Sequence, residues 1–379
     1  IMPGRGRAAT RGESMSGKIP QDAEAIPAGA LNLLSECVHC APRGRLLIVE
    51  EPDGGGYYDD EAPRLAAASA RALGLRVYET VAPPNVASGA EMEDFVETLR
   101  GFDHVLFFSR IGDQIRFAEL PGMPKATMCY ALDREMLFGP FGATCHQGMC
   151  ELKAIIDEAF ARASYVTVTC PRGTSFEGRP QFGPNGPIDV TLQRFPMLVP
   201  RPVPSAGMRG RIAISRFLVG TGSRPYEPYW LALEHDVFAC VEDNRIVDIT
   251  GPAEVAAAVG RHYRQVARRF GLDPWYVHSW HAGIHPACGF GRAAQEDMLR
   301  WSGSAFGSPR ILHFHTCGDY APGEISWNLF DPTVTVDGIA LWDQGVLHPE
   351  RIRGGDELLR RHPRLAAQLS HPRRDVGVD

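Results

Sequence analysis

The stretch LLIVEEPD, residues 46–53, decides the class of fold. Its apolar run is short and ends in a turn, which is typical of a strand buried on both faces of a parallel sheet. The next segment, DEAPRLAAASARALGL (60–75), has its apolar residues at helical spacing, and Gly74 ends the helix. A buried strand followed by a helix predicts the first unit of an open α/β sheet.

The same alternation continues on both sides of this unit. It predicts strands at 76–82, 104–110, 126–132 and 165–171, and helices at 30–41, 92–102 and 151–163. Strands that alternate with helices pair in parallel, and ligands of such sheets usually lie beyond the carboxyl ends of the strands. We therefore expect an N-terminal α/β domain with an open parallel sheet.

The pattern changes after a segment rich in Pro and Gly near residues 180–210. Beyond it the strands are shorter and rich in β-branched residues. VEDNRIVDI (241–249) and TVTVDGIALWDQG (333–345) resemble hairpins with Asp-Asn and Asp-Gly turns. Helices are expected at 252–272 and 355–369. These features predict a C-terminal α+β domain with mainly antiparallel strands.

A chain of 379 residues is long enough for two domains. We expect a disordered leader at 1–29, the N-terminal domain at 30–200 and the C-terminal domain at 201–379. The net charge of −6 favours neither nucleic acid nor an acidic membrane surface as a partner, and no apolar run is long enough to span a bilayer. The nine cysteines are interpreted as reduced thiols of a cytoplasmic protein.

Histidines are concentrated in the second half of the chain. Of the 13, five lie between 278 and 315, namely His278, His281, His285, His313 and His315. Residues two apart on a strand share a face, so His313 and His315 are interpreted as a pair of metal ligands.

The spacing of the other three histidines leaves their roles open. His281 and His285 are four apart, as on one helical face, but the glycine and proline around them indicate a loop. His278, beside two aromatic residues, is interpreted as a hydrogen-bonded core residue, with an additional metal ligand as the alternative. Asp319 and Glu324 follow the His313 strand and could ligate a metal or orient a ligand.

Several stretches resemble the thermophilic aminopeptidase (leucyl aminopeptidase-like) metalloenzymes and their relative 2,5-dihydroxypyridine 5,6-dioxygenase. They are SRIGDQIRF (109–117), PRGTSFEGR (171–179), VEDNRIVDITG (241–251), GIHP (283–286), LHFHTCGDY (312–320) and ISWNLFDPTVTVDGIALWDQGVL (325–347). The resemblance spans roughly residues 44–350 and implies a metal-bearing C-terminal domain and a homodimer. By the resemblance, His313 falls on a histidine ligand and Tyr320 on an active-site tyrosine. His285 falls near a carboxylate ligand and Glu227 near another acidic ligand.

One departure from the family pattern changes the expected site. The family's His-x-Asp ligand pair falls on Ser326 and Asn328, and a hydroxyl and a neutral amide are poor ligands for a transition metal. The metal has then been relocated or lost, or the protein only binds a ligand. Because surplus histidines lie nearby, we predict relocation, with His281, His285, His313 and His315 as the ligands.

The type of ligand indicates the chemistry. A two-metal hydrolase needs several bridging carboxylates, and this region is poor in acids. One ion held by imidazoles with open positions suits Fe(II), with Asp319 or Glu324 as a carboxylate, although Zn, Mn or Co would also fit. We expect a mononuclear non-haem iron oxygenase acting on a small aromatic or heteroaromatic compound, with Tyr320 or His315 as acid–base group. The alternatives are a metallohydrolase and a binding protein that has lost its metal.

Overall fold

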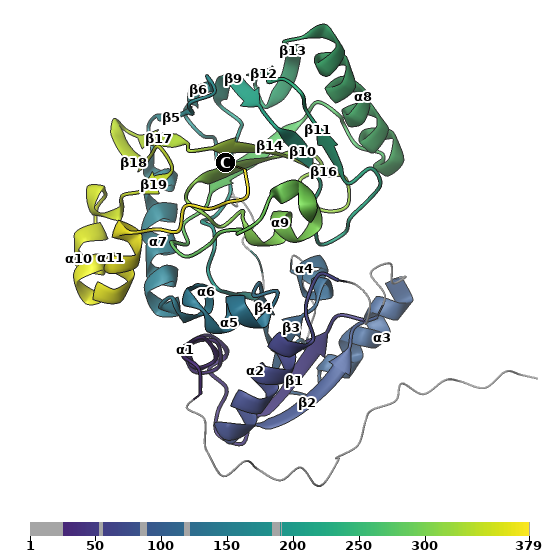
Figure 1. The fold of residues 1–379 in the computed structure, drawn as a ribbon, viewed down its shortest axis with the longest axis vertical. Helices are drawn as coiled ribbons and strands as arrows, with labels where there is room; N and C mark the ends of the chain where they lie inside the picture. Colours follow the sequence, from purple (N-terminus) through teal and green to yellow (C-terminus); the bar gives the residue numbers. More distant parts are fainter. Residues whose placement is uncertain are drawn as a thin grey trace, which may run out of the picture.

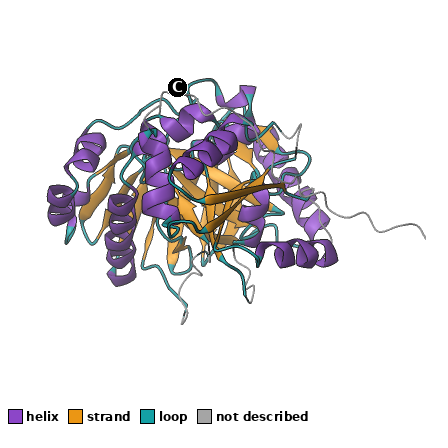
Figure 2. Ribbon diagram, turned by 90° about the horizontal axis from the view of Figure 1, so that it is seen from below, coloured by secondary structure: helices purple, strands orange, loops and turns teal. Residues whose placement is uncertain are grey.

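The computed structural model describes residues 26–52, 56–83, 89–116, 122–183, 190 and 192–378. The leader predicted at 1–29 therefore lies outside the described residues, apart from its last four. The strands form three sheets in the interior, and the helices cover them (Figures 1 and 2). None of the helices in this described part has the length and apolar character that crossing a membrane requires.

The first sheet confirms the prediction made from LLIVEEPD. All its strands are parallel, in the order β2 (Arg76–Val81), β1 (Arg45–Glu50), β3 (His104–Phe108), β4 (Lys125–Cys129) and β7 (Gln193–Phe195). Strand β3 is buried along its whole length, as expected where helices cover both faces. Helix α3 (Gly89–Leu99) precedes β3 in sequence and α4 (Arg110–Ile115) follows it, while α2 (Glu61–Ala72) connects β1 to β2.

The strand predicted at 165–171 exists but belongs to a different sheet, so its assignment to the parallel sheet is wrong. Strand β5 (Val166–Thr169) pairs antiparallel with β17 (Thr333–Val336) and with β6 (Ser175–Gly178). Val166 and Val168 are buried in the core of the C-terminal half. Apolar side chains of a short strand fit either kind of sheet, so periodicity alone could not assign the partner.

The second sheet has eight strands and contains both predicted hairpins. Its order is β13 (Arg245–Thr250), β12 (Val237–Glu242), β9 (Met208–Ile214), β6, β5, β17, β18 (Ile339–Asp343) and β19 (Val346–Leu347). Asp243 and Asn244 join β12 to β13 with φ of 47° and 55°, and Asp337 and Gly338 join β17 to β18 with φ of 47° and 85°. Positive φ at both turn residues is the type I′ geometry that Asp-Asn and Asp-Gly favour.

The Gly338→Ala variant is expected to lower the free energy of unfolding by about 1–2 kcal/mol, because an L-residue is strained at this φ. No atom lies within 4 Å of an added Cβ, so the backbone conformation alone causes the loss. Gly101→Ala is the matched control, since its Cβ also meets open space and its φ lies outside the positive range. Equal urea midpoints for the two variants would contradict the prediction.

The third sheet has six strands and carries the histidines. Its order is β11 (Trp230–Ala232), β10 (Phe217–Val219), β16 (Glu324–Phe330), β15 (Ile311–Cys317), β14 (Val277–Ala282) and β8 (Val203–Pro204). One face packs against the eight-stranded sheet through Trp280, Phe314 and Trp327, all fully buried. The rings of Phe314 and Phe176, one from each sheet, are 5.5 Å apart. Because side chains alternate along a strand, the other face carries the polar residues.

Helices complete the C-terminal half. Helix α8 (Ala253–Phe270) confirms the prediction at 252–272, and α7 (His146–Arg162) packs into the core between the two sheets through Phe160 and Trp280, whose rings are 5.6 Å apart. The helix predicted at 355–369 is two helices, α10 (Gly355–Arg361) and α11 (Pro363–Ser370), because Pro363 cannot continue the first one. The remaining helical elements are α1 (Ala28–Leu31), a π-helix (Asn32–Val38), α5 (Arg134–Phe138), α6 (Pro140–Ala143), α9 (Met298–Ser304) and short 3₁₀ turns at Ala294–Glu296 and Pro349–Arg351.

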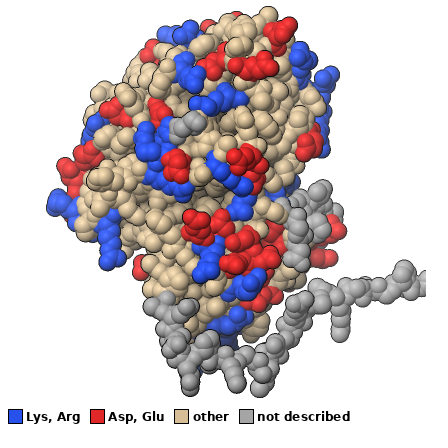
Figure 3. Space-filling view, in the orientation of Figure 1, with Lys and Arg blue, Asp and Glu red and all other residues tan. Residues whose placement is uncertain are grey.

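The face of the molecule shown in Figure 3 carries both kinds of charge. Lys and Arg side chains are interspersed there with Asp and Glu, without one continuous basic patch. Ion pairs form between charged side chains of the described residues, for example between Arg245 and Asp273 at 2.6 Å. All nine cysteines lie in the described residues and have free thiols.

Candidate metal centre

Antiparallel register gathers polar side chains on the free face of the six-stranded sheet. His281 of β14 lies opposite His313 of β15, and His313 lies opposite Asn328 of β16. Two residues further along β15, His315 lies opposite Ser326 of β16. Residues directly opposite one another in a sheet point to the same face, so three histidines, the serine and the amide form one patch.

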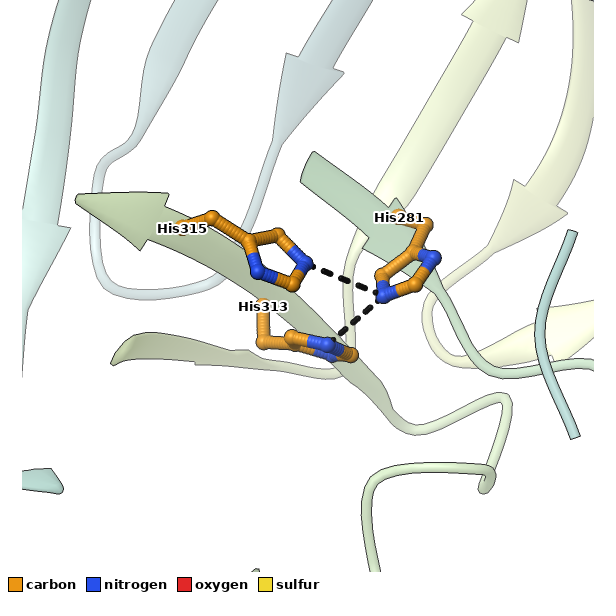
Figure 4. Close-up of side chains that lie close together, drawn as sticks. All are labelled: His281, His313 and His315. Atoms are coloured by element: carbon orange, nitrogen blue, oxygen red, sulfur yellow. Dashed lines mark hydrogen bonds between the residues drawn. The ribbon is translucent and has the colours of Figure 1, made fainter. Parts of the chain in front are cut away.

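The three histidines converge on a single point (Figure 4). Nε2 of His281 is 2.7 Å from Nε2 of His313 and 3.2 Å from Nε2 of His315. All three ligand atoms lie within 4.8 Å of one another. Imidazole nitrogens about 2.1 Å from one metal ion would be roughly 3–3.5 Å apart at adjacent coordination positions. Two of the separations are close to this spacing, so the three residues could hold one ion between them.

A backbone carbonyl fixes the tautomer of His281. Its Nδ1 is 3.1 Å from the carbonyl oxygen of Pro200, which can only accept a hydrogen bond. Nδ1 must then carry the proton, and the lone pair of Nε2 is directed towards the other two histidines. In metal-ligating histidines, the ring nitrogen that does not bind the metal usually donates a hydrogen bond to a carbonyl, a carboxylate or water.

A buried carboxylate supports His315 in the same way. Glu324 is 3% exposed, and its Oε1 lies 3.1 Å from Nδ1 of His315. Burial opposes charge on both groups, but their mutual attraction prevails: the pKa of His315 is raised and that of Glu324 is lowered. The carboxylate beside Nδ1 favours a proton on that nitrogen, which leaves Nε2 for a metal. Glu324 thus lies behind the ligand, outside the group of convergent nitrogens.

The other two imidazoles are neutral near pH 7. Burial, with His315 as a second cause, lowers the pKa of His313 to about 3. Burial and the two neighbouring histidines lower the pKa of His281 well below its ordinary value. Neutral imidazole is the form that binds metals, so these residues need not lose protons before coordinating an ion.

The Glu324→Gln variant is expected to bind metal about 10- to 100-fold more weakly, because the amide supports the His315 tautomer less firmly than a carboxylate does. Asp319→Asn is the control, since Asp319 also lines the cavity but lies 3.9 Å from His278 and outside the three-histidine group. Competition against a chromophoric chelator measures both affinities. A larger loss of metal affinity in Asp319→Asn than in Glu324→Gln would show that Asp319, and not Glu324, is the supporting carboxylate.

The patch forms one wall of a cavity of about 510 Å³. Residues of the N-terminal half line it as well, including Asp113, Arg116 and Tyr130. Arg116 forms an ion pair with Asp113 at 2.6 Å, and the Tyr130 hydroxyl donates to Asp113 at 3.0 Å. Trp301 and Phe306 supply apolar wall. The cavity therefore has a histidine wall, a charged network and aromatic surface, the mixture found in small-molecule sites.

Two predicted residues lie away from the three-histidine group. Strand β14 ends at Ala282, so His285 lies beyond the strand that carries His281. The ring of His285 lies 4.9 Å from the ring of Phe141. His285 is buried there but is not part of the convergent group, so the structure does not support it as a ligand. Glu227 is exposed, outside the residues that line the cavity.

The remaining candidates lie around the cavity. His278 is half-buried, with Nε2 3.0 Å from the carbonyl oxygen of Cys317, in agreement with a hydrogen-bonded role. It also lines the cavity, as do Asp319 and Tyr320, and Tyr320 is 55% exposed. The pairing of Arg116 with Asp113 could be expected from the sequence, whereas the Pro200 carbonyl and the contact of Tyr130 with Asp113 were missed, because a backbone carbonyl has no sequence signal and Tyr130 lies on another element.

The fold and the site define a class: an α/β protein of two halves, with a buried three-histidine cluster facing a cavity between them. Among solved structures, the chain is similar to 2,5-dihydroxypyridine dioxygenase from Pseudomonas putida KT2440, with a TM-score of 0.54 and 14% sequence identity. The match covers 86% of this chain and 98% of that chain. At this identity the likeness concerns the fold. No family model and no curated protein sequence matches the chain.

Proposed function

We propose that the protein is a mononuclear non-haem metal enzyme, an Fe(II)-dependent oxygenase that acts on a small aromatic or heteroaromatic compound. The observation that carries the proposal is the convergence of His281, His313 and His315 at the wall of a cavity. The fold of a dioxygenase supports the same class of chemistry.

The ligand set is consistent with Fe(II). His281, His313 and His315 would hold the ion through imidazole nitrogens, a type of ligand that suits iron. A bound Fe(II) would supply oxygen activation and would hold oxygen atoms of the substrate. Because neutral imidazoles contribute no charge, the ion keeps its full positive charge, which favours substrates that bind as anions through hydroxyl or carboxylate groups.

The chain's own residues would bind and orient the substrate. A volume of about 510 Å³ suits a small molecule, and Trp301 and Phe306 offer aromatic surface for a ring. Asn328, next to His313 and 5% exposed, can donate a hydrogen bond to a substrate oxygen near the ion. If His315 ligates the metal, its lone pair cannot also accept a proton, so Tyr320 at the rim of the cavity is the proposed acid–base group.

A metallohydrolase is the second candidate, and the three-histidine ligand set itself favours it. Zn²⁺ bound by three histidines keeps an open position for water and lowers the pKa of that water. The same residues would then direct the water at a substrate carbonyl in the cavity.

Metal analysis and reaction assays separate these functions. We expect anaerobically purified protein to bind one Fe(II) per chain and to consume oxygen with a panel of dihydroxylated aromatic and pyridine compounds. Tight Zn²⁺ binding with amine release from amide substrates, and no oxygen uptake, would favour the hydrolase. Absence of any stoichiometric metal after reconstitution would overturn both and leave a binding protein.

A further inference from the structure

A second cluster of reactive side chains lies outside the metal centre, at the N-terminus of α7. Cys145 caps this 17-residue helix, and its Sγ accepts a hydrogen bond from the backbone N–H of Gly148 at 3.4 Å. Helices α10 and α11 lie beside α7, with His362 between them (Figure 1). Residues more than 200 positions apart in sequence are thereby brought together.

The side chains of Cys145, His362 and Glu151 form a hydrogen-bonded series in this order. Nδ1 of His362 is 3.7 Å from Sγ of Cys145, and Nε2 of His362 is 3.0 Å from Oε2 of Glu151. Arg361 Nη1 lies 2.8 Å from the same carboxylate oxygen. Burial raises the pKa of Glu151, but His362 and Arg361 outweigh it and the pKa is lowered overall. The carboxylate is therefore ionised and can only accept.

The ionised carboxylate of Glu151 fixes the direction of the hydrogen bonds in this series. Because Glu151 accepts from Nε2 of His362, the lone pair of a neutral imidazole lies on Nδ1, facing the thiol. The thiol proton can then move to His362, and the thiolate that remains lies at the positive end of a long helix. A cysteine, a histidine and an orienting carboxylate in this order are the arrangement that activates a cysteine nucleophile.

We propose that Cys145 is a reactive thiol, a modification site for small electrophiles and low-molecular-weight disulfides. It is independent of the proposed oxygenase function. In the disulfide reaction, Sγ of Cys145 attacks one sulfur of the small disulfide, a new S–S bond forms and the old one breaks. The departing thiolate takes the bonding electron pair and receives the proton from His362. The products are a mixed disulfide on Cys145 and one free small thiol.

The same helix contains an internal control. Cys150 lies 3.4 Å from Nε2 of His146, so it also has a histidine partner. Burial lowers the pKa of His146 to about 4, and Nδ1 of this histidine has no hydrogen-bond partner among the described residues. Burial also raises the pKa of Cys150. Without an orienting carboxylate, this pair is expected to stay neutral and unreactive.

The charged groups that face the cluster come from two elements. Helix α7 contributes Glu151, and α10 contributes Arg361 together with its partner Glu357 at 3.7 Å. Glu357 is also paired with Arg360, so two carboxylates face two guanidinium groups, and the imidazole of His362 and the helix end are the groups that act directly on the thiol. Both Cys145 and His362 are partly exposed, so a small reagent can reach the sulfur.

Brief alkylation of the native full-length protein with iodoacetamide, followed by peptide mass spectrometry, tests the proposal. At pH 7 we expect Cys145 to react at least 10-fold faster than Cys150 and faster than the partly exposed Cys240. The variant His362→Asn should reduce the Cys145 rate at least 10-fold at pH 7 and much less at pH 10. Glu151→Gln should give an intermediate loss, and oxidised glutathione should reproduce the same order as a disulfide probe.

Three results would overturn the proposal. They are a Cys145 rate no greater than that of Cys240, equal pH profiles in wild type and His362→Asn, and preferential labelling of Cys150. The comparison of cysteines uses only the wild-type protein, so the proposal stays open to refutation even if a variant does not fold. Metal content plays no part in the readout, and failure of the oxygenase proposal would leave it unchanged.

Discussion

The His313→Ala variant is expected to retain no stoichiometric metal after dialysis. His313 is one of the three convergent histidines: it lies opposite His281 across β14 and β15, and two residues before His315 on its own strand. Without it, two of the three nitrogens remain to hold the ion. We expect the affinity to fall by more than about 100-fold, beyond the effect of losing a supporting partner.

Titration with Co²⁺, whose visible spectrum reports its coordination, measures this loss without relying on catalysis. His278→Gln is the control inside the cavity, because His278 lines it but lies outside the three-histidine group, and it should keep the metal. His371→Ala is the control on the surface. Normal Co²⁺ binding by His313→Ala would show that the histidines are packed together for another reason.

The Phe314→Ala variant is expected to lower the free energy of unfolding by about 3–5 kcal/mol while the metal site survives. Phe314 is fully buried between the two sheets, with ring centroids 5.5 Å from Phe176 and 5.6 Å from Trp327. Truncation opens a cavity in the core and removes these ring contacts. Chemical denaturation in the presence of chelator measures the loss, because bound metal would add stability of its own.

Adjacent residues of one strand are thus expected to have opposite phenotypes. In chelator, His313→Ala should change stability little, since its side chain points to the cavity, whereas Phe314→Ala should keep the cobalt spectrum wherever it is folded. Phe314→Leu restores most of the volume and should recover part of the loss. A stable Phe314→Ala protein would contradict the description of this face as the core between the sheets.

Much of the fold could be predicted because the apolar residues follow the spacing of strands and helices clearly. The apolar run at 46–49 and the helical spacing that follows it predicted β1 and α2, and the Asp-Asn and Asp-Gly pairs predicted two hairpins. The spacing of His313 and His315 predicted a shared face, and the register with β14 adds His281. These features depend on residues near one another in sequence, where local rules hold.

The rest depends on pairings over long distances. Nothing in YVTVT distinguishes a partner in the parallel sheet from β17, which lies more than 160 residues later. The spacing of His281 and His285 fits one helical face, but Gly283 and Pro286 indicated a loop, and β14 indeed ends at Ala282; the position of His285 in that loop could not be predicted. Glu324 is the first residue of β16, and its role behind His315 follows only from the antiparallel register.

The path of the chain between sheets has a practical consequence for dissecting the protein. Strands β5 and β6 lie before β7 in sequence, yet they fill the centre of the eight-stranded sheet, while β7 closes the edge of the parallel one. A fragment that starts at residue 201 would lack both central strands and would expose the edges of β9 and β17, which invite aggregation. The two halves are therefore best expressed as one polypeptide, and their mutual orientation is set by covalent crossings as well as by packing.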